Sequence, residues 1–282
     1  MPLWLLVQAL IQGATEFLPV SSTGHLGLSW ALLENWGFSV PSRGNQQVID
    51  IALHIGTLLA VILYFRGDIW RVAHGGLALF TPRYGRLDPG SLLFVRLVVA
   101  SVPALLMGVL IADLRESYKN DLALIASTTL LFGLLLWIAD RFCWSTGKLR
   151  HLSLLGAAFV GLLQCLAFIP GVSRSGITIT AARFLGLDRS DAIKLSMLLS
   201  IPLILGAGLY GGLELWAKGE LHLTQSAITA ALIAFCAALV SIHVLMELAQ
   251  RATFLVFVLY RIALGLLIYA VLAFDWLPVA AA

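Results

Sequence analysis

Six apolar runs, each long enough to cross a lipid bilayer, recur along this 282-residue chain. A membrane-spanning helix needs about 17–25 mostly apolar residues, and its backbone hydrogen bonds must be closed without help from water. The runs cover residues 48–66, 92–112, 121–140, 193–213, 226–248 and 254–274. They predict an all-α polytopic membrane protein that forms a single integral membrane domain over residues 1–282, with the bilayer as its solvent.

Composition supports this prediction and argues against other classes of protein. Only 12% of the residues are charged and the mean hydropathy is +0.95, whereas soluble proteins carry about 25% charged residues. The net charge of +3 does not indicate a nucleic-acid partner, and none is expected. The three cysteines, Cys143, Cys165 and Cys236, form no C-x-x-C motif, so neither a disulfide framework nor a zinc site is expected.

Two polar motifs interrupt shorter apolar stretches near the start and the middle of the chain. The first motif reads Glu16-Phe17-Leu18-Pro19-Val20-Ser21-Ser22-Thr23-Gly24-His25. The second motif reads Ile169-Pro170-Gly171-Val172-Ser173-Arg174-Ser175-Gly176-Ile177-Thr178. Polar side chains at membrane depth are costly, so such clusters indicate a functional site. We interpret the two motifs as two halves of one site.

The second motif repeats the first at a distance of 152 residues. Shifting the chain by this distance places Gln12 on Gln164, Val20 on Val172, Ser21 on Ser173 and Gly24 on Gly176. The identities are few, but the apolar runs follow the same order in both halves. The pattern predicts a duplication, with repeat one over about residues 1–140 and repeat two over about residues 150–275.

The distribution of basic residues predicts the topology. If each motif region is a re-entrant helical hairpin, six full transmembrane helices remain. The loops on one side then hold eleven basic residues: Arg66, Arg71, Arg83, Arg86, Arg141, Lys148, Arg150, Arg183, Arg189, Lys194 and Arg251. The other side holds four: Arg43, Arg115, Lys119 and Lys218. The positive-inside rule places the richer side in the cytoplasm.

In this topology the two hairpins enter from opposite sides, so the repeats are inverted. Inverted repeats with broken helices place their binding site near the middle of the membrane. The alternative, in which each motif region crosses the membrane twice, stays open. The polar stretch Asp68–Gly90, which contains several glycines and arginines, is expected to be a loop.

Both motifs share a local logic that favours anion binding. Proline or Pro-Gly ends the incoming helix, and hydroxyl side chains then lie at the start of the next helix, where they cap N–H groups. Two facing helix N-termini with Arg174 between them would form a cradle for phosphate. The alternatives are plain capping by the hydroxyls and a snorkelling role for Arg174. The candidate phosphate ligands are Ser21, Thr23, Gly24, Gly171, Ser173, Ser175 and Thr178.

Gln12 and Glu16 lie four residues apart and therefore share a helix face. Their oxygens could bind a divalent cation, Mg²⁺ or Ca²⁺, together with phosphate. Alternatively, Glu16 pairs with Arg174 without a metal.

Ser22 and His25 are separated by one helical turn, which leaves two chemical schemes open. Either Ser22 attacks with His25 as its base, or His25 itself attacks and becomes phosphorylated.

Two more features concern polar residues outside the motifs. Asp50 and His54 form an i,i+4 pair that either lines the route to the site or only caps a helix. Arg96 and Arg261 lie inside apolar runs and need partners that the sequence does not identify.

The two motifs together resemble those of the bacterial undecaprenyl pyrophosphate phosphatases, the bacitracin-resistance family. The first signature of that family, Glu/Gln-x-x-x-Glu followed by P-V-S-S-T-G-H, stands here as Gln12, Glu16 and residues 19–25. The second, P-G-x-S-R-S-x-x-T, stands here as residues 170–178. The first position of this signature can be Glu in the family but is Gln12 here, which weakens any mechanism that needs two carboxylates.

The resemblance implies an integral membrane phosphatase in the bacterial plasma (inner) membrane, multi-pass, with its site open toward the periplasmic side. It implies removal of the terminal phosphate from undecaprenyl diphosphate, which recycles the lipid carrier for peptidoglycan synthesis and confers bacitracin resistance. It also implies dependence on a divalent cation, Ser22 as nucleophile, and Glu16, His25 and Arg174 as essential partners.

The sequence leaves rival functions to be tested. Inverted repeats are typical of transporters, so a polyprenyl-phosphate transporter or flippase could use the same headgroup site. The Lys-x6-Arg-Pro motif of another lipid-phosphatase superfamily is absent from this sequence. A scaffold without catalysis is disfavoured by the polar residues at depth. The oligomeric state is not fixed by the sequence, which is compatible with a homodimer.

Overall fold

The computed structural model describes residues 2–38, 40–80, 88–112, 114, 118, 121–143, 146–219 and 224–274, but not the side chains of residues 23, 31 and 43. Of the residues discussed above, Arg83, Arg86, Arg115, Lys119 and the side chains of Thr23 and Arg43 therefore lie outside the described part. The α-helices are α1 (Leu3–Thr15), α2 (Ser22–Asn35), α3 (Arg43–Tyr64), α4 (Arg66–Ala78), α5 (Pro89–Leu110), α7 (Leu122–Phe142), α8 (Leu154–Gln164), α9 (Arg174–Phe184), α10 (Arg189–Ala217), α11 (Gln225–Arg251) and α12 (Leu255–Ala273). Two short 3₁₀ helices, η1 (Leu149–His151) and η2 (Cys165–Phe168), complete them.

Six of these helices, within the described residues, are long and apolar enough to cross a membrane: α3, α5, α7, α10, α11 and α12. They coincide with the six apolar runs of the sequence, which confirms the prediction of an all-α polytopic membrane protein. Helices α1 and α8 are apolar but have only 13 and 11 residues. A helix rises about 1.5 Å per residue, so neither can span the roughly 30 Å of hydrocarbon.

Four of the long helices begin at a side chain that caps their first turn. The residues Asp88, Asp121, Asp188 and Thr224 precede α5, α7, α10 and α11, and each accepts a hydrogen bond from a backbone N–H of the first turn. Such caps satisfy N–H groups that have no partner inside the helix. The starts of these helices are thus fixed by local sequence rather than by packing alone.

Helix α4 corrects the expectation of a loop over residues 68–90. It begins directly after α3 and continues to Ala78. At Gly75 an added Cβ would lie 2.1 Å from the backbone of Gly90, so the two segments cross at very close range. Asp68 also pairs with Lys194 of α10, at 3.1 Å. The glycine that reads as a loop signal in the sequence instead permits close packing between a helix and the start of α5.

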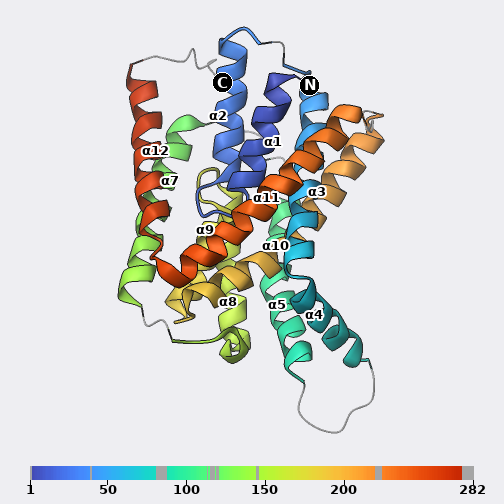
Figure 1. Ribbon diagram of the computed structural model, residues 1–282, viewed down its shortest axis with the longest axis vertical. Coiled ribbons are helices and arrows are strands. Elements are labelled where there is room, and N and C mark those ends of the chain that lie inside the picture. Colours follow the sequence, from blue (N-terminus) through green and yellow to red (C-terminus); the bar gives the residue numbers. More distant parts are fainter. Residues whose placement is uncertain are drawn as a thin grey trace.

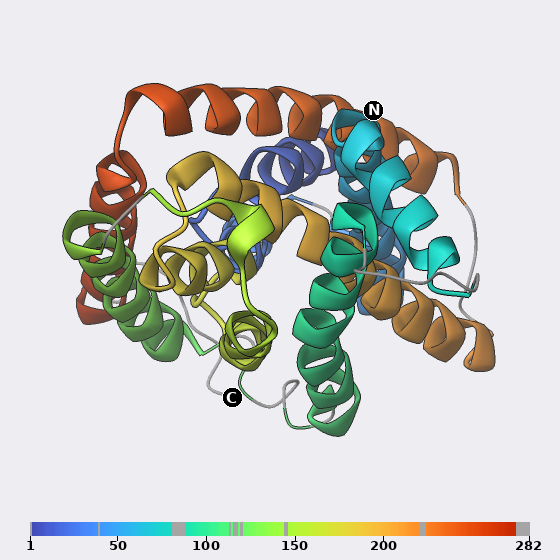
Figure 2. The ribbon, with the colours of Figure 1, turned by 90° about the horizontal axis from the view of Figure 1, so that it is seen from below.

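The two short hairpins, formed by α1 with α2 and by α8 with α9, occupy the middle of the molecule. Figure 1 shows α1 and α2 in the upper half, α8 in the lower half, and the turns between the paired helices near the centre. Seen from below, α8 and α9 lie between the α7–α12 pair on one side and α3 and α5 on the other, with α11 along one edge (Figure 2). The long helices thus surround the two hairpins, and the polar turns lie between them.

Helix α9 is the most enclosed part of this arrangement. Every residue from Ser175 to Arg183 is buried, although the helix contains several polar side chains. It packs against α7, α8 and α10. At its far end Arg183 lies 3.2 Å from Asp140 of α7, which also pairs with Arg189 of α10 at 2.8 Å. This ion-pair group fixes α9 to both neighbours, because a buried charge needs close partners.

Candidate functional site

Two serines with left-handed backbones form the turns that begin α2 and α9. Ser21 and Ser173 both have a φ of +72° and, within the described residues, are the non-glycine residues with positive φ. Such a conformation costs about 1–3 kcal/mol and persists only where the surroundings enforce it. These serines are the pair that the 152-residue shift superimposes. The same unusual backbone therefore recurs at matched positions of the two motifs.

The start of α9 is closed by its own side chains. Ser173 Oγ accepts a hydrogen bond from the Gly176 N–H at 3.2 Å and lies 3.1 Å from Ser175 Oγ. Ser175 Oγ in turn donates to the Leu18 carbonyl of the first turn, at 2.8 Å. Thr178 Oγ1 donates to the Arg174 carbonyl at 2.9 Å and lies 2.7 Å from Ser196 Oγ. The Ser175–Leu18 bond joins the two turns, and the other bonds lie within α9 or join it to α10.

The start of α2 is more open. Ser21 makes no side-chain capping bond to the first turn of the helix. Without such a cap, the N–H groups at a helix N-terminus are free to bind an anion, which the helix dipole also favours. The two halves of the predicted cradle therefore differ. The start of α2 has N–H groups without a side-chain cap, whereas the hydroxyls at the start of α9 are already hydrogen-bonded within the protein.

Glu16 is the hub of the site. One carboxylate oxygen, Oε2, accepts from Gln12 Nε2 at 3.0 Å and from Ser22 Oγ at 2.9 Å. The other, Oε1, accepts from Arg174 Nη2 at 2.9 Å. The Glu16 side chain is only 8% exposed and that of Arg174 only 11%. A residue from each motif thus meets in one buried ion pair, and the serine hydroxyl points at the same carboxylate.

Arg174 has further partners that fix its orientation. Its Nη1 donates to the Ser196 carbonyl of α10 at 3.1 Å. Its guanidinium carbon lies 5.7 Å from the centre of the Phe17 ring, within the range of a cation–π contact. The guanidinium is therefore held between the two turns rather than reaching toward a membrane surface, as the snorkelling alternative would require.

His25 uses both ring nitrogens, and neither contacts Ser22. Nδ1 lies 2.7 Å from the Ser21 carbonyl, and because a carbonyl only accepts, Nδ1 carries the proton. Nε2 lies 2.5 Å from the hydroxyl of Tyr260 on α12, which donates to it. The two rings also stack, with centres 5.6 Å apart and planes 12° apart. In this geometry Ser22 has Glu16, not His25, as its neighbouring base.

His54 lies beside the same carboxylate. Its Nε2 is 3.9 Å from Glu16 Oε2, and its Nδ1 is held by the Asp50 carbonyl at 2.7 Å. Of the two interpretations of the Asp50–His54 pair, the geometry fits the one that places His54 along the wall of the site.

The two glycines of the candidate phosphate ligands differ sharply. Gly171 has a φ of +86°, and a Cβ there would lie 2.2 Å from Thr128 Oγ1 on α7. A Cβ at Gly24 would meet its neighbours at 3.5 and 3.6 Å, which is ordinary contact. Gly171 is therefore required by the tight fit of the second turn against α7, and Gly24 is not required by space.

Arg261 is the residue that the sequence pattern did not assign to the site. It lies on α12 and is fully buried, and the hydrogen bonds that it donates within the described part of the chain all go to backbone carbonyls. Its partners are Pro19 (3.3 Å), Val172 (3.1 Å), Gly171 (2.9 Å) and Thr129 (3.1 Å). One guanidinium thus ties the first turn, the second turn and α7 together. Its presence inside an apolar run was the signal, but only the fold shows its partners.

The donor atoms for a cation are few. Gln12 Oε1 is buried without a hydrogen-bond partner, and Glu16 is the adjacent carboxylate. Within the part of the chain that the structure describes, no group of three His, Cys, Asp or Glu side chains could hold a metal ion. One carboxylate and one amide oxygen do not form a complete cage, but Mg²⁺ commonly binds through one or two carboxylates plus substrate phosphates. The residues fit a cation that arrives with phosphate.

Comparison with known proteins shows which family this chain resembles over nearly its whole length. The family model described as bacitracin resistance protein BacA matches residues 5–267. A protein named undecaprenyl-diphosphatase from Teredinibacter turnerae is 44% identical over 273 residues, covering 94% of this chain and 97% of the relative. One of the same name from Dinoroseobacter shibae is 45% identical over 264 residues, covering 93% and 95%. Undecaprenyl-diphosphatase 1 from Rhodospirillum rubrum is 42% identical over 279 residues, covering 98% of each chain.

Proposed function

The chain belongs to the bacitracin resistance protein BacA family, and from this premise we propose that it is an undecaprenyl-diphosphate phosphatase. It removes the terminal phosphate of undecaprenyl diphosphate and returns the monophosphate carrier to peptidoglycan synthesis. A role in bacitracin resistance fits the description of the family. The observation that carries the proposal is the meeting of Glu16, Ser22 and Arg174 in one buried cluster.

The geometry supports a serine mechanism. Ser22 Oγ forms a bond to the terminal phosphorus while its proton passes to Glu16, 2.9 Å away. The bond from that phosphorus to the bridging oxygen breaks, and its electron pair leaves with the lipid monophosphate. A water molecule then attacks the phosphoserine, releases inorganic phosphate and restores the hydroxyl. Arg174 and the open N-terminus of α2 stabilise the charge on the phosphate oxygens.

His25 is the other candidate nucleophile, and its present contacts argue for a supporting role. Both ring nitrogens are engaged, by the Ser21 carbonyl and by Tyr260. We place it beside the phosphate as the group that exchanges a proton with the leaving oxygen or with the attacking water. A phosphohistidine trapped during turnover, with no phosphoserine, would reverse this assignment.

A divalent cation, Mg²⁺ or Ca²⁺, is proposed at Glu16 and Gln12. These two residues supply a carboxylate and a free amide oxygen, and the diphosphate would complete the ligand set. When bound, such a cation neutralises phosphate charge. Arg174 already pairs with Glu16, so the guanidinium and the cation would share this carboxylate.

The architecture supports inverted repeats built from two re-entrant hairpins. The α1–α2 and α8–α9 hairpins lie in opposite halves of the molecule with their turns facing each other (Figure 1). Helix α1 packs on α11 as α8 packs on α5, and the pairs α3–α10 and α7–α12 each join equivalent helices of the two repeats. An exchange of repeats, residues 1–140 for 150–275, therefore reproduces these helix pairs, although the close packing of α9 on α7 and α10 has no counterpart of similar extent at α2 within the described residues.

We propose that the protein lies in the bacterial inner membrane with the site open toward the periplasmic side. The excess of basic residues assigns the end of the molecule with α4 and the start of α8 to the cytoplasm. The α1–α2 hairpin, with its open N-terminus, then faces the opposite side. Association as a homodimer stays a prediction, to be tested by the mass of the purified protein in detergent.

The test is release of inorganic phosphate by the purified chain from undecaprenyl diphosphate. The proposal expects release by the parent protein and loss of release in the His25→Ala and Ser22→Ala variants. The rival function, a polyprenyl-phosphate transporter, predicts movement of the lipid between leaflets of a vesicle without phosphate release. That result in the parent protein would contradict the proposal.

A further inference from the structure

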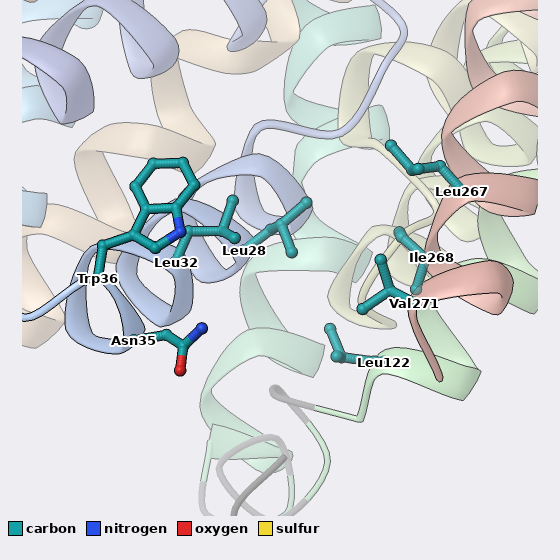
Figure 3. Close-up of a pocket in the computed structure, with 8 residues that line it drawn as sticks. All are labelled: Leu28, Leu32, Asn35, Trp36, Leu122, Leu267, Ile268 and Val271. Atoms are coloured by element: carbon teal, nitrogen blue, oxygen red, sulfur yellow. The ribbon is translucent and has the colours of Figure 1, made fainter. Parts of the chain in front are cut away.

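An apolar crevice opens between α2 on one side and α7 and α12 on the other. Its volume is about 230 Å³. Figure 3 shows side chains of α2 facing those of α12 and α7 across the gap. Its walls are made mainly by Leu28, Leu32 and Trp36 of α2, Leu122 of α7, and Leu267 and Val271 of α12.

The hydrogen-bonded pair His25 and Tyr260 lies on the same two helices as the main walls of the crevice. Leu28 and Leu32 follow His25 by three and seven residues, which places all three on one face of α2. Leu267 and Val271 follow Tyr260 by seven and eleven residues on α12. At about 1.5 Å per residue, Leu32 lies roughly 10 Å along the axis from His25. The His25–Tyr260 contact therefore lies about one helical turn before the crevice on α2 and about two turns before it on α12.

We propose that this crevice binds the polyprenyl chain of the diphosphate substrate, an inference that rests on the proposed function. The argument for this occupant is proximity: Ser22, His25 and Leu28 follow one another at intervals of three residues along α2, and the crevice walls beyond them are apolar. A hydrocarbon chain attached to a phosphate held at Ser22 must leave the site along some apolar path. Ordinary ligand cavities measure about 300–1,000 Å³, so this smaller one holds only the segment of the chain nearest the headgroup.

The outer end of the crevice suits a lipid that enters from the side. Trp36 is 67% exposed, and Asn35 lies next to it at the end of α2. An indole beside a polar amide is typical of the boundary between hydrocarbon and water. Leu267 is 51% exposed, so the α12 wall also reaches the surroundings. The chain can thus remain in the bilayer while the headgroup reaches the buried cluster.

The first experiment narrows the crevice and measures kcat and KM for undecaprenyl diphosphate. Val271→Trp fills the gap, and Leu266→Trp is the matched control because Leu266 is 58% exposed on the same helix and does not line the crevice. Displacing a couple of methylene groups is expected to raise KM about tenfold with little change in kcat. Equal KM values for the two variants and the parent would overturn the proposal.

The second experiment is independent of turnover. A polyprenyl diphosphate with a diazirine in its first isoprene units is photolysed on the full chain carrying Ser22→Ala. The proposal expects label on residues 28–36 and 267–271, and its loss when undecaprenyl diphosphate competes. Label elsewhere, or label that only a phospholipid displaces, overturns the crevice assignment. If the parent protein releases phosphate in that case, the proposed function stands; if it releases none, the function itself fails.

Discussion

The two hairpins share a backbone but differ in how their polar groups are used. In the α8–α9 hairpin, Ser173, Ser175 and Thr178 bond to one another, to backbone or to a neighbouring helix, and α9 is buried. In the α1–α2 hairpin, Ser22 points at Glu16 and the helix start has no side-chain cap. The difference indicates a division of labour. In the proposed mechanism the second hairpin is a support that delivers Arg174, and the first hairpin carries the reacting groups.

The largest effect is expected from removing one hydroxyl from each hairpin. Ser22→Ala should lower kcat on the order of 10³-fold or more, because the proposed nucleophile is lost. Ser175→Ala should change kcat little. Each variant should cost about 1 kcal/mol of stability, because Ser22 loses its bond to Glu16 and Ser175 its bond to the Leu18 carbonyl. Phosphate release and thermal unfolding in detergent measure both. Equal losses of kcat would erase the proposed difference between the hairpins.

Arg261 tests whether one side chain holds both turns. Arg261→Leu leaves backbone carbonyls of Pro19, Gly171 and Val172 without this donor, and each unpaired buried group costs about 1–3 kcal/mol. We expect a loss of at least about 3 kcal/mol in unfolding free energy, together with lower kcat. Arg261→Lys should recover part of both.

The matched control for Arg261 is Arg96→Leu. Arg96 is also a buried arginine in a long helix, but within the described residues its hydrogen bond goes to the Leu149 carbonyl, far from the turns. This variant should keep kcat close to that of the parent. A parent-like stability for Arg261→Leu would show that the two turns are held by other contacts.

A smaller effect is expected from adding a methyl group to each turn. Gly171→Ala meets Thr128 Oγ1 at 2.2 Å and has a positive φ, so we expect a loss of about 2–4 kcal/mol. Gly24→Ala has room and lies in the first turn of α2, where alanine favours the helix by about 0.5–1 kcal/mol. Thermal unfolding of the two variants decides this. If Gly24→Ala were the more damaging, the first turn would be the tighter one.

The smallest effect is expected from Asp188→Asn, at the connection between α9 and α10. Burial raises the pKa of the Asp188 carboxyl, but hydrogen bonds from Lys148 and from the Asp191 N–H outweigh it and hold that pKa below its ordinary value. A carboxylate whose folded pKa is depressed stabilises the fold above its unfolded pKa of about 4, and that contribution is lost as pH falls further. Asp188→Asn should therefore flatten the acid side of the stability curve. Phosphate release at neutral pH should not change, because Asp188 is remote from Glu16; a large loss would contradict the assignment of the site.

The sequence predicted the parts that local pattern determines. Bilayer-length apolar runs predict the six long helices, because length and hydropathy alone decide whether a helix can span. The left-handed backbones of Ser21 and Ser173 occur where the repeat aligned the two motifs. The proximity of Glu16 and Arg174 follows from treating the motifs as halves of one site.

Other features depend on contacts between distant residues, which no local pattern contains. The glycines of residues 68–90 suggested a loop, but one of them, Gly75, instead lets α4 cross the start of α5 at close range. Tyr260 meets His25 across 235 positions of the chain, and Arg261 meets both turns from the last helix. The choice of Glu16 rather than His25 as the neighbour of Ser22 depends on side-chain orientation.

The most direct test of the central claim, that the two turns form one site, is a double-mutant cycle on phosphate release with Glu16→Gln and Arg174→Ala. If the 2.9 Å ion pair acts as one unit, the double variant should be little worse than the poorer single variant. If the two losses in kcat/KM instead multiply as independent factors, Glu16 and Arg174 act apart, and the account of a shared site is wrong.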